Sequence, residues 1–253
     1  MIYDADSELY DLQYANYRDD IAHYLRLADD LGSPVLELGA GTGRVTAALA
    51  RAGHSVVAVD AAAAMLARAG VRLAEAGLAD GVELVNGDMR TFEYKTTFPL
   101  VIAPFNTLMH LYTIADQDAA LARVRAHLEV GGVFAFDLYV PRFGMLGVAR
   151  VEPYWQGLEG RPDDGARLRN DLFVVHEHDE PAQVLTSTYY FDSVAVDGRL
   201  HRSVATLRQR YYTRFELERA LDKAGFRLEL YGAFDRSRFD EHSALLVGLA
   251  RAT

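Results

Sequence analysis

A short apolar strand that runs directly into closely spaced glycines and then into a helix is the strongest constraint on this chain. Residues 35–44 read VLELGAGTGR. Gly39, Gly41 and Gly43 lack a Cβ atom, so the backbone can turn sharply there and approach a ligand closely. In open α/β sheets, ligands bind outside the carboxyl ends of the strands, which is where such a turn lies. The segment therefore predicts an α/β fold with a ligand beside the glycines.

Strand-like and helical stretches alternate up to residue 138. Short apolar runs predict strands at 34–38, 55–59, 82–85, 100–104 and 133–138. Helical periodicity predicts helices at 16–30, 44–52, 61–76 and 116–128. Because strands that alternate with helices form a parallel sheet covered on both faces, we expect that architecture here.

The pattern changes after residue 138. Alternating apolar and polar residues predict antiparallel strands at 168–178, 184–196 and 200–212, with a hairpin turn at Asp197 and Gly198. Thr213 and Glu216 form the signature of a helix-starting capping box, and two strands at 226–231 and 244–250 end the chain. The predicted fold is a doubly wound, seven-stranded and mostly parallel α/β sheet (1–143 and 212–253) with an inserted antiparallel β lobe (144–211).

Composition and charge exclude several classes of function. The chain has 253 residues and no cysteine, which removes disulfides, thiolate metal sites and cysteine nucleophiles. A net charge of -10 disfavours nucleic acid as a partner. Because no apolar run is long enough for a membrane span and the first residues are acidic, we expect a cytoplasmic protein. His176, His178 and His201 are explained better by an exposed strand face than by a metal site, so no metal is expected.

Acidic residues follow the second and third predicted strands. Asp60 comes about 20 residues after the glycine turn, where this fold presents a carboxylate to ribose hydroxyls. Asp88, in the sequence NGDMR at 86–90, could accept a hydrogen bond from an adenine amino group, with Met89 against the ring. A pyrophosphate cofactor is disfavoured, because Arg44 occupies the position of the third glycine in the dinucleotide motif.

These elements together resemble the class I S-adenosylmethionine-dependent methyltransferases. The motif ELGAGTG at 37–43, the acid at residue 60, the GDM sequence at 87–89 and the two closing strands carry the resemblance, which covers nearly the whole chain. It implies S-adenosylmethionine as cofactor, with S-adenosylhomocysteine as product. The cofactor residues that it implies are Glu37, Gly39, Ala40, Gly41, Asp60, Ala61, Met65, Asp88, Met89 and Phe105.

The N-terminal segment is similar to the lid of aminosugar N-methyltransferases in that family. The likeness implies that residues 1–33 form lid helices, that Tyr14 borders the sulfonium and that Arg18 meets the methionine carboxylate. A surface helix packing its aromatic residues on the core is the alternative. The same likeness implies that Tyr212 and Arg214 border the acceptor pocket, although they could instead be core and cap residues.

The loop after the fourth predicted strand carries the candidates for catalysis. Methyl transfer from a sulfonium is an in-line displacement, so the protein mainly aligns the reactants. A general base is needed only if the acceptor arrives protonated, and histidine suits that role near neutral pH. His110 is therefore our candidate base and Asn106 a candidate substrate contact. A packed histidine and a helix-capping asparagine are the respective alternatives.

We therefore expect an enzyme that transfers a methyl group to nitrogen or oxygen of a small soluble metabolite. One alternative is a non-catalytic protein that binds the cofactor or a related nucleoside, because binding and turnover need different residues. Another is an aminopropyl-type transferase on the same fold, although the paired acids that would bind a polyamine are not evident. A homodimer could form through an edge of the inserted sheet.

Overall fold

The structure is a computed structural model that describes residues 10–11, 14, 17–141, 154–158, 167–195 and 198–253. Two compact units make up the chain: residues 18–141 with 211–253, and residues 1–17 with 142–210. Of the described residues near the N-terminus, Tyr10, Asp11, Tyr14 and Tyr17 belong to the second unit. The sequence assigned residues 1–33 to the cofactor domain as a lid, and the functional domain limits stay a prediction.

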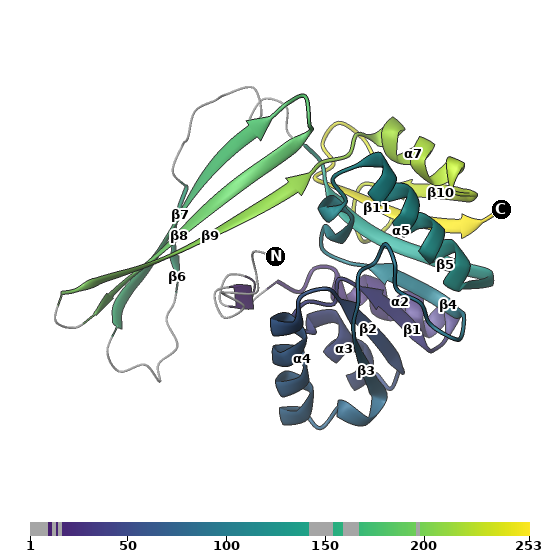
Figure 1. The fold of residues 1–253 in the computed structure, drawn as a ribbon, viewed down its shortest axis with the longest axis horizontal. Coiled ribbons are helices and arrows are strands. Elements are labelled where there is room, and N and C mark those ends of the chain that lie inside the picture. Colours follow the sequence, from purple (N-terminus) through teal and green to yellow (C-terminus); the bar gives the residue numbers. More distant parts are fainter. Residues whose placement is uncertain (1–9, 12–13, 15–16, 142–153, 159–166, 196–197) are drawn as a thin grey trace. The chain divides into compact units, whose positions relative to one another are not determined.

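The larger unit is built on a seven-stranded sheet (Figure 1). Its strands are β1 (Val35–Leu38), β2 (Val56–Asp60), β3 (Val82–Asn86), β4 (Phe98–Ala103), β5 (Leu128–Tyr139), β10 (Phe226–Tyr231) and β11 (Leu245–Ala252). They lie in the order β10-β11-β5-β4-β1-β2-β3. β11 runs antiparallel to both of its neighbours, and the other strand pairs are parallel. The predicted fold class is confirmed.

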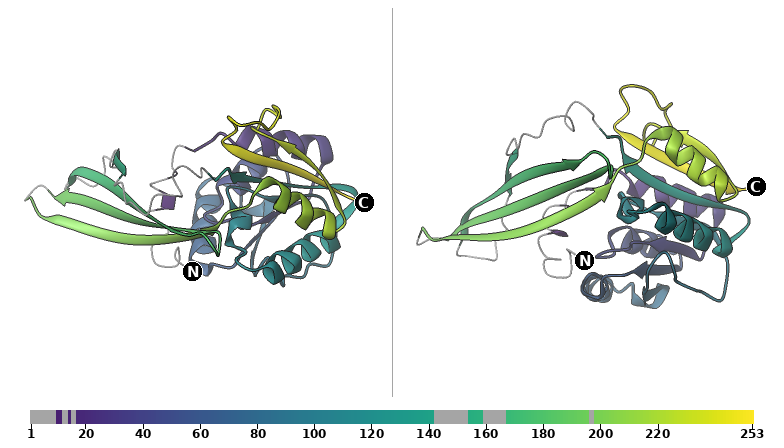
Figure 2. Two further views of the ribbon diagram at one scale, coloured as in Figure 1. Left: turned by 90° about the horizontal axis from the view of Figure 1, so that it is seen from above. Right: turned by 45° about the horizontal axis from the view of Figure 1, so that its top comes forward.

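Helices cover both faces of this sheet. They are α2 (Ile21–Leu31), α3 (Arg44–Arg51), α4 (Ala63–Glu75), α5 (Ile114–His127) and α7 (Arg214–Lys223), with 3-10 turns η2 (Ala79–Gly81) and η3 (Thr107–His110). On one face, α3 lies between α2 and α4 and contacts both. On the opposite face, α5 contacts α7 (Figure 2). Apolar side chains of α2 and α3 pack on β1, β2, β4 and β5 in one buried cluster.

The ends of the predicted elements shifted where capping or pairing decides them. α2 begins at residue 21 rather than 16; its N-cap residue, the buried Asp20, pairs with Arg44 and makes no side-chain cap. α5 begins at residue 114 rather than 116, because Thr113 and Asp116 form a capping box there. The predicted capping box of Thr213 and Glu216 is present at α7.

The second unit contains a four-stranded antiparallel sheet in the order β6-β7-β8-β9. Its strands are β6 (Tyr154–Leu158), β7 (Arg167–Asp179), β8 (Val184–Ala195) and β9 (Leu200–Arg210). The sequence did not indicate β6, and Asp197 of the expected turn lies outside the described residues. His176 is paired with Ser187 at 2.8 Å. Within the described residues, no cluster of three or more metal-ligating side chains occurs, and no helix is long and apolar enough to cross a membrane.

Candidate functional site

The glycine turn after β1 is held in place by the carboxylate that ends β2. Gly39, Gly41 and Gly43 have φ values of 67°, 58° and 77°, in the left-handed region that favours glycine. The Gly41 amide donates a 2.8 Å hydrogen bond to Asp60 Oδ2, and the Ala62 amide donates one of 2.8 Å to Asp60 Oδ1. Asp60 therefore joins the glycine turn to the start of α4. It holds both segments in place at the point where a ligand would approach the backbone.

Glu37 is a buried acid directly before the turn. It is only 2% exposed, and Thr46 donates a 2.6 Å hydrogen bond to its Oε2. The pKa of Glu37 is raised to about 8, mainly because burial disfavours its charged form; Asp20 and Asp60 also raise it, whereas the Thr46 hydrogen bond and the Arg44 charge lower it. Because burial disfavours the charged form, a cation bound nearby would favour ionisation of this carboxyl.

A buried ion pair fixes Arg44, which stands where the dinucleotide motif has its third glycine. The Arg44 guanidinium donates two hydrogen bonds of 2.6 Å to the two oxygens of Asp20, which is fully buried. The same guanidinium lies over the Phe105 ring, 5.4 Å from its centroid. Such bidentate pairing fixes the side-chain geometry. Arg44 thus connects the start of α2, the start of α3 and the loop after β4.

The loop after β4 has an uncommon backbone conformation. Phe105 and Asn106 have φ values of 53° and 64°, which residues other than glycine rarely adopt. The Phe105 amide donates to Asp137 Oδ1 at 2.9 Å, and the Asn106 amide donates to the Asp137 carbonyl at 3.0 Å. The Asn106 side-chain oxygen accepts from the Tyr139 amide at 2.8 Å and makes no helix cap. Consecutive strained residues held by specific bonds are typical of functional sites.

His110 ends the 3-10 turn that follows this loop. Its side chain is half-buried, and desolvation lowers the pKa of its imidazole below 6.5. The ring is therefore neutral near pH 7, as a general base requires. The buried Tyr212 hydroxyl donates a 3.1 Å hydrogen bond to the carbonyl of Leu108. Tyr212 thus supports the turn that carries His110.

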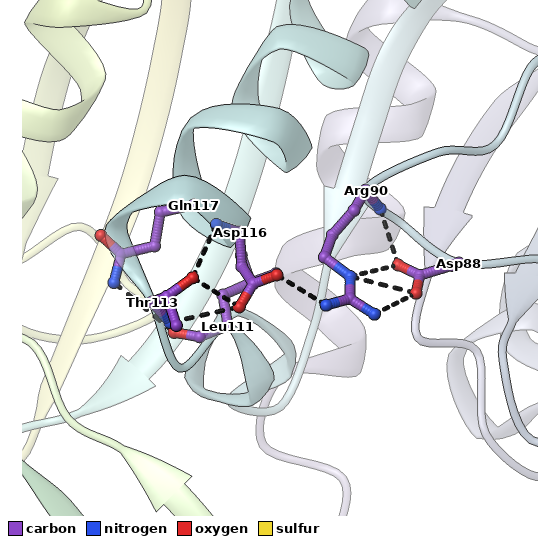
Figure 3. A network of polar contacts seen from close by, with 6 residues as sticks. All are labelled: Asp88, Arg90, Leu111, Thr113, Asp116 and Gln117. Carbon is purple, nitrogen blue, oxygen red and sulfur yellow. Dashed lines mark hydrogen bonds and ion pairs between the residues drawn. The ribbon is translucent and has the colours of Figure 1, made fainter. Parts of the chain in front are cut away.

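Asp88 lies after β3 in a network with Arg90 and Asp116 (Figure 3). The Arg90 guanidinium contacts both Asp88 oxygens at 2.5–3.0 Å and Asp116 Oδ1 at 2.6 Å. Its hydrogen bonds hold the pKa of the Asp88 carboxyl below its usual range. Since Asp116 also belongs to the capping box of α5, Arg90 connects the β3 loop to the start of that helix.

Comparison with known proteins agrees with this architecture. Residues 35–132 match the family described as "Methyltransferase domain". The dTDP-3-amino-3,6-dideoxy-alpha-D-glucopyranose N,N-dimethyltransferase of Streptomyces fradiae is 28% identical over 236 residues, 88% of this chain and 84% of that protein. The CcbJ methyltransferase from Streptomyces caelestis has a TM-score of 0.76 at 27% identity, covering 94% of this chain and 92% of that one. The glycopeptide N-methyltransferase MtfA, solved with S-adenosylmethionine, has a TM-score of 0.57 at 26% identity, covering 94% and 96%.

The chain carries a methyltransferase domain, and it is similar over almost its whole length to class I S-adenosylmethionine-dependent methyltransferases. The family predicted from the sequence is confirmed, and S-adenosylmethionine is the family's cofactor. Across five further relatives that are 28–37% identical to it, this chain covers 43–63% of the relative's length. The roles of individual residues and the acceptor of this methyltransferase are therefore matters for proposal.

The charges of this methyltransferase site suit a cationic cofactor. Asp20, Glu37 and Asp137 are buried, Asp60 is half-buried, and the Arg44 charge acts on both Glu37 and Asp137. An excess of carboxyl groups favours a ligand that carries a sulfonium and an ammonium group, and it disfavours a pyrophosphate. The open left-handed turn at Gly41, where an added Cβ would meet only Met65 Cε at 3.6 Å, leaves room for close approach.

Other predicted site residues of the methyltransferase are exposed or lie outside its unit. Arg214 is exposed on the first turn of α7, where it donates to Glu218 at 2.7 Å and lies over the Phe215 ring. Arg18 is exposed just before α2. Tyr14 belongs to the second unit, so its place beside the sulfonium stays a prediction. Asp20 and Asp137 were not predicted as site residues; for Asp137 the available signal was an acid inside an apolar strand.

Proposed function

We propose that this methyltransferase transfers a methyl group from S-adenosylmethionine to an amino nitrogen of a small metabolite of the amino-sugar class. The observation that carries the proposal is the glycine turn fixed by Asp60, beside a cluster of buried carboxyl groups. The choice of nitrogen is supported by the names of the Streptomyces fradiae N,N-dimethyltransferase and of the glycopeptide N-methyltransferase.

In this proposal each part of the cofactor meets a separate element. Asp60 accepts from the ribose hydroxyls, and Asp88 with Met89 meets the adenine. Glu37 and the glycine turn lie at the methionine end, where Arg18 meets the carboxylate. The cofactor supplies an activated methyl group, so the remaining task of the chain is to align the acceptor and to remove a proton from an ammonium acceptor.

Two measurements in sequence test the proposed function. Calorimetric titration with S-adenosylmethionine, S-adenosylhomocysteine and NAD should show binding of the first two and none of the third. Incubation with S-adenosylmethionine and matched amino and hydroxyl sugars should then give methylated product from the amino sugars alone, detected by mass spectrometry. Binding without transfer to any acceptor would favour a non-catalytic protein, and methylation of the hydroxyl sugars would assign oxygen as the target.

His110→Ala should reduce turnover by about 100-fold, because general-base catalysis contributes on the order of 10² or more. Affinity for the cofactor should change by less than about twofold, since in this proposal the ring meets the acceptor and not the cofactor. Steady-state kinetics with calorimetry of cofactor binding separates the two effects. The matched control is His54→Ala, because His54 pairs with Asp29 at 3.0 Å near the amino end of β2. Wild-type turnover in His110→Ala would remove this residue as the base.

A further inference from the structure

Asp137 occupies an unexpected place near the carboxyl end of β5. It is a buried acid in a strand that is otherwise apolar at this end. Its Oδ1 accepts two hydrogen bonds, one of 2.6 Å from the Tyr24 hydroxyl on α2 and one of 2.9 Å from the Phe105 amide. Burying a carboxyl group is costly unless it is hydrogen-bonded. The described contacts join this carboxyl group to α2 and to the backbone of the loop after β4.

The backbone that it holds is the left-handed loop after β4. The Asp137 side chain bonds the Phe105 amide, and its carbonyl bonds the Asn106 amide, so one residue fixes both strained positions. The Phe105 ring lies in turn beneath the Arg44 guanidinium. Two left-handed residues in succession persist only when their surroundings determine them, and Asp137 supplies the bonds that do so.

We infer that Asp137 and Tyr24 are positioning residues for methyl transfer, which set the loop of Phe105 and Asn106 through hydrogen bonds to one carboxylate oxygen. This inference rests on the proposed function, because the loop leads into the turn that carries His110. Neither residue needs to touch the cofactor or the acceptor. Tyr24 also brings α2 into the arrangement, so the entry of the chain into this unit is coupled to the loop after β4.

The titration of Asp137 offers a readout that does not depend on catalysis. The pKa of Asp137 is raised to about 6, mainly by burial and also by Asp20, although the hydrogen bonds from Tyr24 and Phe105 and the Arg44 charge lower it. The carboxylate that holds Phe105 is therefore present above pH 6 and is lost below it. Loss of the Tyr24 hydroxyl removes a bond to the charged form, so it should move this midpoint to higher pH.

The first experiment follows the Phe105 amide by NMR in cofactor-free protein labelled with 15N-phenylalanine. Its resonance, assigned with Phe105→Leu, should shift with a midpoint near pH 6 in the wild type. The midpoint should rise in Tyr24→Phe, and the titration should disappear in Asp137→Asn. The matched control is Tyr94→Phe, which loses a hydroxyl bonded to Glu83 on β3. A Phe105 amide that titrates identically in the wild type, Tyr24→Phe and Asp137→Asn would overturn the inference.

The second experiment measures turnover and cofactor affinity in the same variants. Tyr24→Phe should lower kcat by about tenfold with little change in the dissociation constant of S-adenosylmethionine, and Tyr94→Phe should leave both unchanged. Asp137→Asn should retain more turnover than Asp137→Ala, because an amide oxygen can still accept from Phe105. Wild-type kcat in Tyr24→Phe would overturn the positioning role. Failure of the wild type to bind the cofactor would instead reject the proposed function. The NMR titration would still test the hydrogen bonds of Asp137, because it uses cofactor-free protein.

Discussion

Replacing Gly39 with alanine should destabilise the protein by about 2–5 kcal/mol and weaken cofactor binding. The residue has a φ of 67°, and a left-handed conformation costs an alanine about 1–2 kcal/mol. Its new Cβ would also lie 2.6 Å from both Cγ2 and Oγ1 of Thr107. Thr107 is itself held by a 2.6 Å hydrogen bond to the Pro104 carbonyl, so overpacking adds about 1–3 kcal/mol. Urea unfolding measures the total.

Gly77→Ala is the matched control for this prediction. Gly77 has the same φ of 67°, but an added Cβ there would meet nothing within 4 Å. The difference between the two variants therefore isolates the contact with Thr107. Thr107→Ala in the Gly39→Ala background should recover part of the loss, since it removes both crowding atoms. Equal stability of Gly39→Ala and Gly77→Ala would mean that the loop after β4 moves away from the added methyl group without a measurable loss of stability.

The sheet and its helices were predictable because their signals are local. Apolar periodicity defined the seven strands, and the pattern of Thr213 and Glu216 gave the start of α7 correctly. The start of α2 was wrong because Asp20 is fixed by Arg44, 24 residues away in sequence. No periodicity within a helix reveals a partner on another element, since such a bond depends on how the elements pack.

In the candidate site, too, local features could be predicted from the sequence and long-range contacts could not. Gly39, Gly41 and Asp60 could be found from spacing, because the turn and the acid follow adjacent strands of a common fold. Tyr24 and Asp137 could not be paired, since 113 residues separate them. Their bond forms only after α2 has packed on the sheet. The sequence therefore predicted the glycine turn and its acid, but it did not predict the bonds that hold the loop after β4.

Asn106 shows that placing a loop correctly does not predict the hydrogen bonds of its side chain. The sequence placed it after the fourth strand, and the structure does so too. Its side-chain oxygen nevertheless accepts from the Tyr139 amide, which neither the substrate contact nor the helix cap anticipated. The direction of a side chain at a left-handed residue is set by backbone conformation and neighbours. Such details require the folded structure.

Asp60→Ala should raise the dissociation constant of S-adenosylmethionine by at least tenfold, which corresponds to about 1.4 kcal/mol. Two effects add in the same direction. The variant loses the proposed ribose contact, and it leaves the Gly41 and Ala62 amides without the carboxylate that now accepts from both at 2.8 Å. An unpaired, partly buried donor costs about 1–3 kcal/mol, so the turn itself should loosen. Calorimetric titration measures the affinity, and urea unfolding reports the loosened turn.

Two comparison variants separate these effects. Asp60→Asn keeps one oxygen that can accept from Gly41 or Ala62 but not from both, so its affinity should lie between those of the wild type and Asp60→Ala. Asp88→Ala should cost less than Asp60→Ala, because the Asp88 side chain is 33% exposed and is held by Arg90 rather than by the backbone of the turn. If Asp60→Ala binds S-adenosylmethionine as tightly as the wild type, the turn does not depend on this carboxylate and Asp60 is not the ribose acid.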